Sequence, residues 1–304
     1  MKLSVITVSW NSDQTIAEQI RSVVFACRNS EFEQILIDNA SSDQTVAIIK
    51  TGFPRVTLIA NEKNMGFAHA NNQGVALAKG EYLLFLNPDM RMLPNHLDRF
   101  IEWMDVHPDV GIASCKLINK DGNFNENAKP RRFPKIGEQV ALVFKLPHLF
   151  PSLFKNYFYH DFNPNDEQEV DSLRGSLMMM RKSFVEKLGF AFDPRYFIWF
   201  EDVDICREAH RLGYKVMYTP KFQCVDYVGQ SFRQRPSYWK QKHFTKSMLQ
   251  YFQKWEPWYK WIWIALVRPV GLVLVWINET FMKLTGFDMK SLSRLEKKAH
   301  EPSK

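Results

Sequence analysis

Residues 81–90 read EYLLFLNPDM, an apolar run that ends in an Asn-Pro-Asp turn. Tyr82 to Leu86 are continuously apolar, which is typical of a strand covered on both faces. Pro88 lacks the N–H that a ladder needs, so the strand ends there and Asp89 stands at its carboxyl end. In open α/β sheets that edge binds ligands, and a carboxylate there suits a hard cation. The alternative interpretation is an Asx-type turn that only caps the next helix.

The chain before this stretch alternates strand-like and helix-like patterns. The expected strands are residues 3–8, 34–37, 56–60 and 82–86, and the expected helices are 16–27, 46–50 and 68–78. This alternation predicts an α/β fold with a Rossmann-like, mostly parallel sheet and helices on both faces. Each strand ends in polar residues that we expect to line one crevice: Ser9-Trp10-Asn11, Asp38-Asn39, Asn61 and Asn87-Pro88-Asp89.

The composition narrows the class of partner. The chain of 304 residues carries a net charge of +7, which indicates an anionic partner such as nucleic acid, an anionic membrane or a phosphorylated substrate. No recognised nucleic-acid module supports the first of these. The cysteines form no CxxC pair, and the N-terminus lacks the pattern of a signal peptide, so we expect a cytoplasmic location. There is also no GxGxxG or Walker loop, so phosphates would be bound through a divalent ion on Asp89.

A second segment of interest, residues 197–214, reads FIWFEDVDICREAHRLGY and contains two adjacent acids after its first four residues. Its apolar spacing predicts a helix over 203–212, so Glu201 and Asp202 lie at the helix N-terminus. The helix dipole favours an ionised carboxylate there, as a general base requires, although ordinary N-capping is the alternative. The aromatic residues just before the acids are expected to form a ligand-facing wall: Tyr196, Phe197, Trp199 and Phe200.

Two further segments stand apart from the alternating pattern. Residues 119–168 are irregular in pattern and predict a long loop over the site. Residues 258–281 are strongly apolar but are interrupted by Arg268 and Pro269, which leaves halves too short to span a bilayer. An interfacial membrane anchor is therefore favoured over a core helix pair or a tilted span. Its headgroup-level lysines would be Lys254, Lys260 and Lys283.

Six motifs in order resemble the inverting family 2 glycosyltransferases, particularly a bacterial rhamnosyltransferase-like branch. They are VSWNS, IDNASSDQT, NEKNMGFAHANNQG, GEYLLFLNPD, LRGSLMMMRK and FEDVDICREAHRLGY, and the resemblance covers roughly residues 3–250. It implies a GT-A type catalytic domain over residues 1–250, with a nucleotide-sugar-binding half (1–118) and an acceptor-binding half (119–250). Residues 251–304 would form a helical, membrane-associating extension with a basic tail.

The resemblance also implies site residues. Those for the nucleotide sugar are Ser9, Asn11, Asp38, Asn64, Gly66, Asn71 and Asn87. Asp38 would accept the imide hydrogen of a pyrimidine base, and Gly66 would allow close backbone approach. Asn71 stands where many relatives place an arginine near the diphosphate. The catalytic residues would be Asp202, as general base, and Glu201, while the acceptor would contact Gly175, Ser176 and Trp199.

The implied metal site departs from the family pattern. Asp89 would coordinate Mg²⁺ or Mn²⁺, but Asn87 replaces the first acid of the usual pair. Asp226 and Tyr227, in VDYVGQS, stand where relatives often carry histidine. Asp226 would then serve as an oxygen ligand in place of a histidine, or the contact would be missing.

The reaction implied by the resemblance is inverting transfer of a hexose, with L-rhamnose from dTDP-rhamnose favoured. The acceptor would be a polyprenyl-diphosphate-linked glycan of a bacterial surface polysaccharide, such as O-antigen or capsule, at the inner face of the plasma membrane. The alternatives are a UDP-sugar-dependent hexosyl or N-acetylhexosaminyl transferase and a non-catalytic scaffold that binds sugar nucleotides. No nucleic-acid partner is expected.

Overall fold

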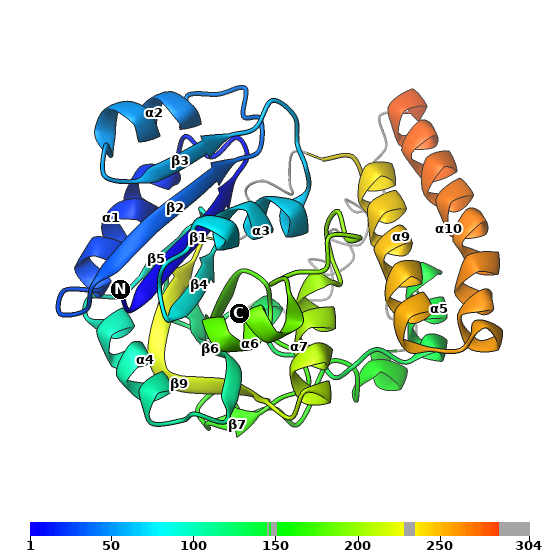
Figure 1. The fold of residues 1–304 in the computed structure, drawn as a ribbon. Coiled ribbons are helices and arrows are strands. Elements are labelled where there is room, and N and C mark those ends of the chain that lie inside the picture. The colour runs from blue at the N-terminus through cyan, green and yellow to red at the C-terminus, as the bar shows by residue number, and fades with distance from the viewer. Residues whose placement is uncertain (145, 147–150, 228–234, 286–304) are drawn as a thin grey trace, which may run out of the picture.

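This computed structural model describes residues 1–144, 146, 151–227 and 235–285. They form a nine-stranded sheet in the order β3-β2-β1-β4-β8-β6-β9-β5, with β7 paired to β9 (Figure 1). The strands are β1 (Leu3–Ser9), β2 (Phe32–Asp38), β3 (Thr57–Ala60), β4 (Tyr82–Leu86), β5 (Met90–Met92), β6 (Val110–Ile118), β7 (Gln168–Glu169), β8 (Leu177–Arg181) and β9 (Lys215–Asp226).

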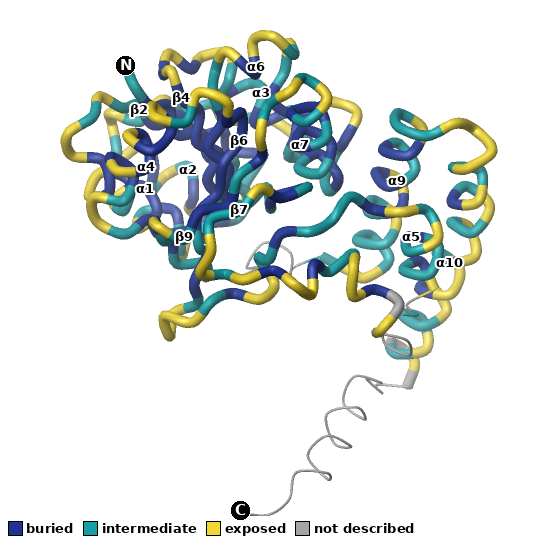
Figure 2. Tube along the Cα trace, turned by 90° about the horizontal axis from the view of Figure 1, so that it is seen from below, coloured by how far each residue is buried: buried dark blue, intermediate teal, exposed yellow. Residues whose placement is uncertain are grey.

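The first four strands confirm the predicted parallel arrangement. β1 pairs in parallel with β2 and β4, and β2 pairs in parallel with β3. Every residue of β4 is buried, as its continuous apolar run predicts, because helices cover both faces of the sheet. Figure 2 shows the buried residues gathered in the middle of the sheet, around β4 and β6. The carboxyl ends of β1, β2 and β4 therefore meet at one edge.

The second half of the sheet is mixed. β8 runs antiparallel to both β4 and β6, whereas β6 and β9 are parallel. β5 and β7 pair antiparallel with β9. Because Leu86 pairs with Leu177, the start of β8 lies beside the end of β4. This reversal brings Gly175 and Ser176, just before β8, to the same edge as the Asn-Pro-Asp turn.

The helices follow most of the expected pattern. They are α1 (Ile16–Ala26), α2 (Thr45–Gly52), α3 (Phe67–Leu77), α4 (His96–Asp105), α5 (Ile136–Val143), α6 (Lys182–Leu188), α7 (Glu201–Arg211), α9 (Ser237–Trp255) and α10 (Trp258–Thr285), with 3₁₀ turns η1 (Glu126–Ala128) and η3 (Pro151–Phe154). The prediction of an irregular segment over 119–168 is wrong at α5. That helix forms because it has a partner far along the chain, α10, against which it packs.

Helix α10 corrects the expectation for the C-terminal stretch. It is continuous through Pro269, and Trp258–Met282 is long and apolar enough to cross a membrane, judged by length and composition alone. Arg268 does not interrupt it, because its Nε donates to Thr245 Oγ1 of α9 at 3.2 Å. Helix α9 runs through residue 250, so the helical unit beside the sheet begins at Ser237.

The expected headgroup lysines are not equivalent. Lys260 is exposed and pairs with Glu256, whereas the side chain of Lys283 lies outside the described part. Lys254 is only 15% exposed, so its expected place at headgroup level is wrong. Its ammonium group instead lies among buried carboxylates of α7 and of the preceding loop, because α9 packs against that region.

Candidate functional site

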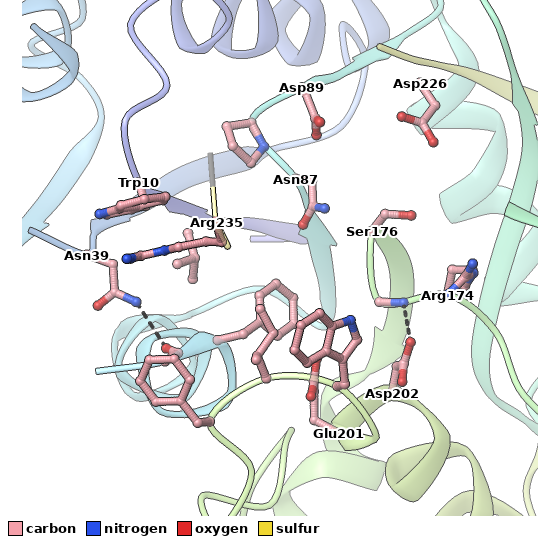
Figure 3. A pocket seen from close by; sticks show the side chains of 18 of the residues that line it. Trp10, Asn39, Asn87, Asp89, Arg174, Ser176, Glu201, Asp202, Asp226 and Arg235 are labelled. Carbon is pink, nitrogen blue, oxygen red and sulfur yellow. Dashed lines mark hydrogen bonds between the residues drawn. The ribbon is translucent and has the colours of Figure 1, made fainter. Parts of the chain in front are cut away.

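The strand ends open into one cavity of about 370 Å³, shown in Figure 3. The predicted site residues that line it are Asn64, Gly66, Asn87, Asp89, Gly175, Ser176, Trp199, Glu201, Asp202 and Asp226. They come from turns widely separated in the sequence. The antiparallel pairing of β8 with β4 brings Gly175 and Ser176 beside Asn87 and Asp89. The cavity therefore contains the expected base, the expected acceptor-side residues and the expected metal ligands.

Four predicted nucleotide-binding residues lie outside this lining. Asp38 is 1% exposed, and its carboxylate accepts hydrogen bonds from the hydroxyl groups of Ser9 and Ser41. The side-chain oxygen of Asn11 accepts from the Ser42 N–H, and the Asn71 amide donates to the Phe67 carbonyl within α3. These side chains shape the turns behind the cavity wall.

The turn before α3 is tied together by amides that do line the cavity. The Asn39 amide donates to the Gly66 carbonyl at 3.1 Å, and the Asn64 side-chain oxygen accepts from the Gly66 N–H at 3.0 Å. Gly66 has φ +84°, and a Cβ there would lie 2.5 Å from the Phe197 carbonyl oxygen. The close approach that Gly66 allows is thus to the protein's own backbone before α7.

Asp202 is positioned by an unusual backbone. Trp199 and Phe200 both have positive φ, at 67° and 69°, directly before α7. Such conformations are costly for bulky residues and mark functional segments. They turn the first residues of α7 into the cavity, where Asp202 Oδ2 accepts from the Gly175 N–H at 3.1 Å. The Val203 N–H donates to Oδ1 of the same carboxylate at 2.8 Å.

The two acids differ in their surroundings. Burial raises the pKa of Asp202, but the Arg174 charge and the N–H groups of Gly175 and Val203 oppose that rise. Burial and the neighbouring charge of Asp202 raise the pKa of Glu201 well above its usual range. Glu201 Oε2 is buried with no hydrogen-bond partner among the described residues. Asp202 is therefore the better-stabilised anion of the pair, and the helix terminus alone does not keep both acids ionised.

The Asn-Pro-Asp turn supplies an oxygen-lined corner. Asp89 and Asp226 both face the cavity, since Met90 pairs with Asp226 across β5 and β9 (Figure 3). Asp226 Oδ2 also accepts from the Asn125 amide at 2.8 Å. Within the described residues no group of three or more His, Cys, Asp or Glu residues gathers as a metal site. Two carboxylates fit a hard cation that takes its remaining ligands from a diphosphate and water.

Further residues line the cavity, and only some of them were expected from the sequence. Trp10 and Asn39 follow β1 and β2, as expected of strand ends, whereas Asn61 does not line the cavity. Phe197 and Trp199 form the expected aromatic wall, while Tyr196 and Phe200 are buried in the core. Among the residues with no assigned role, those with polar or charged groups that line the cavity are Asn125, Asn127, Arg174, Arg235 and Trp239.

Arg235 lies two residues before α9 and Trp239 lies in its first turn, in a segment to which no motif pointed. The Arg235 guanidinium lies 3.9 Å from the ring centre of Trp10 and 4.9 Å from that of Trp239. Figure 3 shows it stacked on Trp10. This aromatic and cationic side of the cavity suits a flat or anionic ligand.

Comparisons with known proteins identify relatives of this chain. The sequence model described as "Glycosyl transferase family 2" matches residues 4–189, well over half of the chain. Rhamnosyltransferase WbbL of Escherichia coli is 30% identical over 171 residues, which are 54% of this chain and 61% of that protein. An N-acetylglucosaminyl-diphospho-decaprenol L-rhamnosyltransferase of Mycobacterium tuberculosis is 23% identical over 77% of this chain and 79% of its own. An uncharacterised glycosyltransferase of Haemophilus influenzae is matched over only 41% of its length.

Solved structures share the fold at low sequence identity. A mannosyltransferase from Pyrobaculum calidifontis, in complex with GDP-Man and Mn²⁺, matches 98% of this chain and 79% of its own at 17% identity and a TM-score of 0.57. GalNAc-T7, with UDP, GalNAc and Mn²⁺, matches 86% of this chain and 49% of its own at 19% identity and a TM-score of 0.62. These likenesses confirm the predicted GT-A type of fold.

Proposed function

This chain belongs to glycosyl transferase family 2, and from that premise we propose that it transfers L-rhamnose from dTDP-rhamnose to a hydroxyl of a lipid-linked glycan, with inversion. The observation that carries the proposal is one cavity lined by the Asp202 carboxylate and by the carboxylates of Asp89 and Asp226. The names of the Escherichia coli and Mycobacterium tuberculosis relatives support the donor and the class of acceptor.

The proposed reaction is a single displacement. The acceptor hydroxyl lies against Asp202, its oxygen bonds to the anomeric carbon, and the bond from that carbon to the nucleoside diphosphate breaks on the opposite face. Asp202 takes the hydroxyl proton as the new bond forms. The N–H groups of Gly175 and Val203 hold the carboxylate in place before and after that transfer.

The donor is proposed to bind along the strand ends. Asp38 would reach the imide of the pyrimidine only by exchanging its hydrogen bonds from Ser9 and Ser41 for one from the base. Ser9, Asn11 and Asn71 would support the turns behind the base and the diphosphate. Asn64, Gly66 and Asn87 would line the sugar nucleotide. Trp10 adds a flat apolar surface for the base at the same edge.

Asp89 and Asp226 would hold a divalent ion, and Mn²⁺ in the two neighbouring structures supports that class of cation. Mg²⁺ or Mn²⁺ bound there supplies positive charge to the diphosphate as it leaves. Asn87 would contribute a neutral side chain at this corner, so the protein provides two negative charges from Asp89 and Asp226.

A UDP-linked hexose or N-acetylhexosamine is the second candidate donor, favoured by UDP in the GalNAc-T7 structure. A non-catalytic sugar-nucleotide-binding scaffold is the third. The strained backbone before Glu201 and Asp202 is evidence against a scaffold, because binding alone does not require it.

The first experiment is a thermal-shift screen of the purified protein with dTDP-rhamnose, UDP-sugars and GDP-sugars, with and without Mn²⁺. We expect dTDP-rhamnose with Mn²⁺ to raise the melting temperature by several degrees, since ligand at about 100 times its Kd adds about 2.7 kcal/mol. Asp89→Ala should abolish the shift. An equal shift without metal, or an unchanged shift in Asp89→Ala, would remove Asp89 from the donor site.

Helix α10 is proposed to lie in the membrane interface. Its exposed apolar residues recur three and four residues apart along one face: Trp258, Tyr259, Trp263, Leu266, Val270, Val273, Leu274, Trp276, Ile277, Phe281 and Leu284. The opposite face packs on α9 and α5, where Ile264 is fully buried. Because α9 carries Lys240, Lys242 and Lys246, the helix pair is better suited to lie on an anionic surface than to cross it.

Vesicle flotation tests this orientation. The wild type should float with anionic vesicles, and Val270→Asp/Ile277→Asp should remain at the bottom of the gradient, because two charges enter the apolar face. Val106→Asp changes an exposed apolar residue on the far side of the sheet and should float like the wild type. Flotation of the double variant would place the membrane contact elsewhere.

A further inference from the structure

Two arginines beside the cavity lack a carboxylate partner. Arg174 lines the cavity, and its Nε and Nη2 donate to the Asn127 carbonyl at 3.1 and 2.6 Å. The Arg131 guanidinium lies over the Phe158 ring, 4.9 Å from its centre. Across residues 1–144, 146, 151–227 and 235–285, no carboxylate forms a salt bridge with either side chain. An unpaired guanidinium that is partly buried is unusual, since burial of a charge costs free energy.

The fold brings these two charges together. The backbones of Arg131 and Ser172 exchange hydrogen bonds of 3.2 Å, and Arg174 follows two residues later. Burial and the Arg174 charge lower the pKa of Arg131 to about 10, so Arg131 remains charged at neutral pH. Glu126 attracts Arg131 without forming an ion pair with it. Two positive charges close enough for one to lower the pKa of the other repel unless an anion lies between them.

Polar side chains surround Arg131 and Arg174, and some of these side chains lack hydrogen-bond partners among the described residues. The Tyr157 hydroxyl lies near enough to Arg131, Arg174 and Asp202 for each charge to affect its pKa. Gln139 of α5 is fully buried, and its amide makes no well-formed hydrogen bond with a described residue, although Tyr157 is close to it. Helix α5 in turn packs against α10. The pair therefore lies between the catalytic carboxylate and the helix with the exposed apolar face.

We propose that Arg131 and Arg174 bind the diphosphate that links the acceptor glycan to its lipid. This inference rests on the proposed function. Guanidinium groups bind phosphate oxygens by paired, charge-assisted hydrogen bonds. In Figure 3 Arg174 lies on the Asp202 side of Ser176, whereas Asp89 lies on the other side, where the donor diphosphate is proposed to bind. The acceptor's sugar would reach Asp202 while its lipid runs toward α10.

The test measures binding of farnesyl diphosphate by titration calorimetry, with dTDP and Mn²⁺ at saturation so that the donor site is filled. Farnesol, which lacks the diphosphate, is the neutral reference. Arg131→Gln should weaken binding of farnesyl diphosphate about 10- to 100-fold, and Arg131→Lys should restore part of the loss. Arg132→Gln is the matched control, because Arg132 already pairs with Asp171 and Asp161 at 3.4 and 3.7 Å. It should bind like the wild type, and all variants should bind dTDP normally.

Three results would overturn the inference. They are a wild type that binds farnesyl diphosphate no more tightly than farnesol, an Arg131→Gln variant with unchanged affinity, and displacement of farnesyl diphosphate by dTDP. Displacement by dTDP would mean that farnesyl diphosphate binds in the donor site. Failure of the proposed function is distinguishable, since it would leave farnesyl diphosphate binding intact while no sugar nucleotide bound or reacted.

Discussion

Asp202→Asn is expected to lower the rate of sugar transfer by about 10² to 10⁴, the range that general-base assistance supplies. An amide keeps the shape of the side chain but cannot take the acceptor proton. Binding of dTDP-rhamnose with Mn²⁺, measured by thermal shift, should persist, because the proposed donor contacts lie on the other side of Ser176. Glu201→Gln should lose much less activity, since burial favours the protonated form of Glu201. The reverse order of losses would exchange the roles of the two acids.

The pH profile of kcat/KM tests the same assignment. Asp202 acts as a base only when ionised, and burial raises its pKa. Activity should therefore fall as the pH drops through that raised pKa, so the acidic limb lies above the range of an ordinary aspartate. The residual activity of Asp202→Asn should show no such acidic limb in its pH profile. If the variant keeps the limb, a group other than Asp202 causes it.

Lys254→Ala is expected to lower the free energy of unfolding by about 3–5 kcal/mol, the cost of leaving a buried charge without its partner. The Lys254 ammonium lies 2.6 Å from Asp204, 2.8 Å from Glu208 and 3.3 Å from Asp193. Asp193 and Glu208 have second partners in Arg195 and Arg211, whereas Asp204 is fully buried. Urea unfolding monitored by circular dichroism measures the loss.

Lys260→Ala is the matched control for Lys254→Ala. Lys260 pairs with Glu256 at 2.8 Å on the surface, so its removal should change the unfolding midpoint little. The loss in Lys254→Ala should also shrink at acid pH. Burial raises the pKa of Asp204, and once this carboxyl is protonated Lys254 faces only Asp193 and Glu208, which keep their arginine partners when the lysine is removed. Equal losses in the two variants would contradict a structural role for the buried cluster.

The sequence predicts the first half of the sheet well. Continuous apolar runs that end in Asn or Asp fix the strands, and 3.6-residue periodicity fixes α1 and α3. The second half depends on tertiary pairing. The direction of β8 follows from its place between β4 and β6, and α5 exists because α10, far along the chain, covers it. Local patterns carry no information about either partner.

The residues of the candidate site also divide into those that local motifs predict and those that only tertiary packing brings to the cavity. Asp89, Asp202 and Gly175 lie in recognisable motifs, and the structure places all three at one cavity. Arg235, just before α9, and Trp239, in its first turn, reach the cavity because of how α9 packs beside it. Lys254 reads as an exposed flanking lysine in the sequence, and only the packing of α9 against α7 shows that it is enclosed by carboxylates.

We propose that this cavity performs inverting transfer with Asp202 as the base. The most direct measurement is proton NMR of the product formed from dTDP-rhamnose, Mn²⁺ and a synthetic N-acetylglucosaminyl diphospho-lipid. We predict a rhamnoside whose anomeric configuration is opposite to that of the donor, formed by the wild type and nearly absent with Asp202→Asn. A product that retains the donor's configuration, or equal formation by Asp202→Asn, would contradict the account.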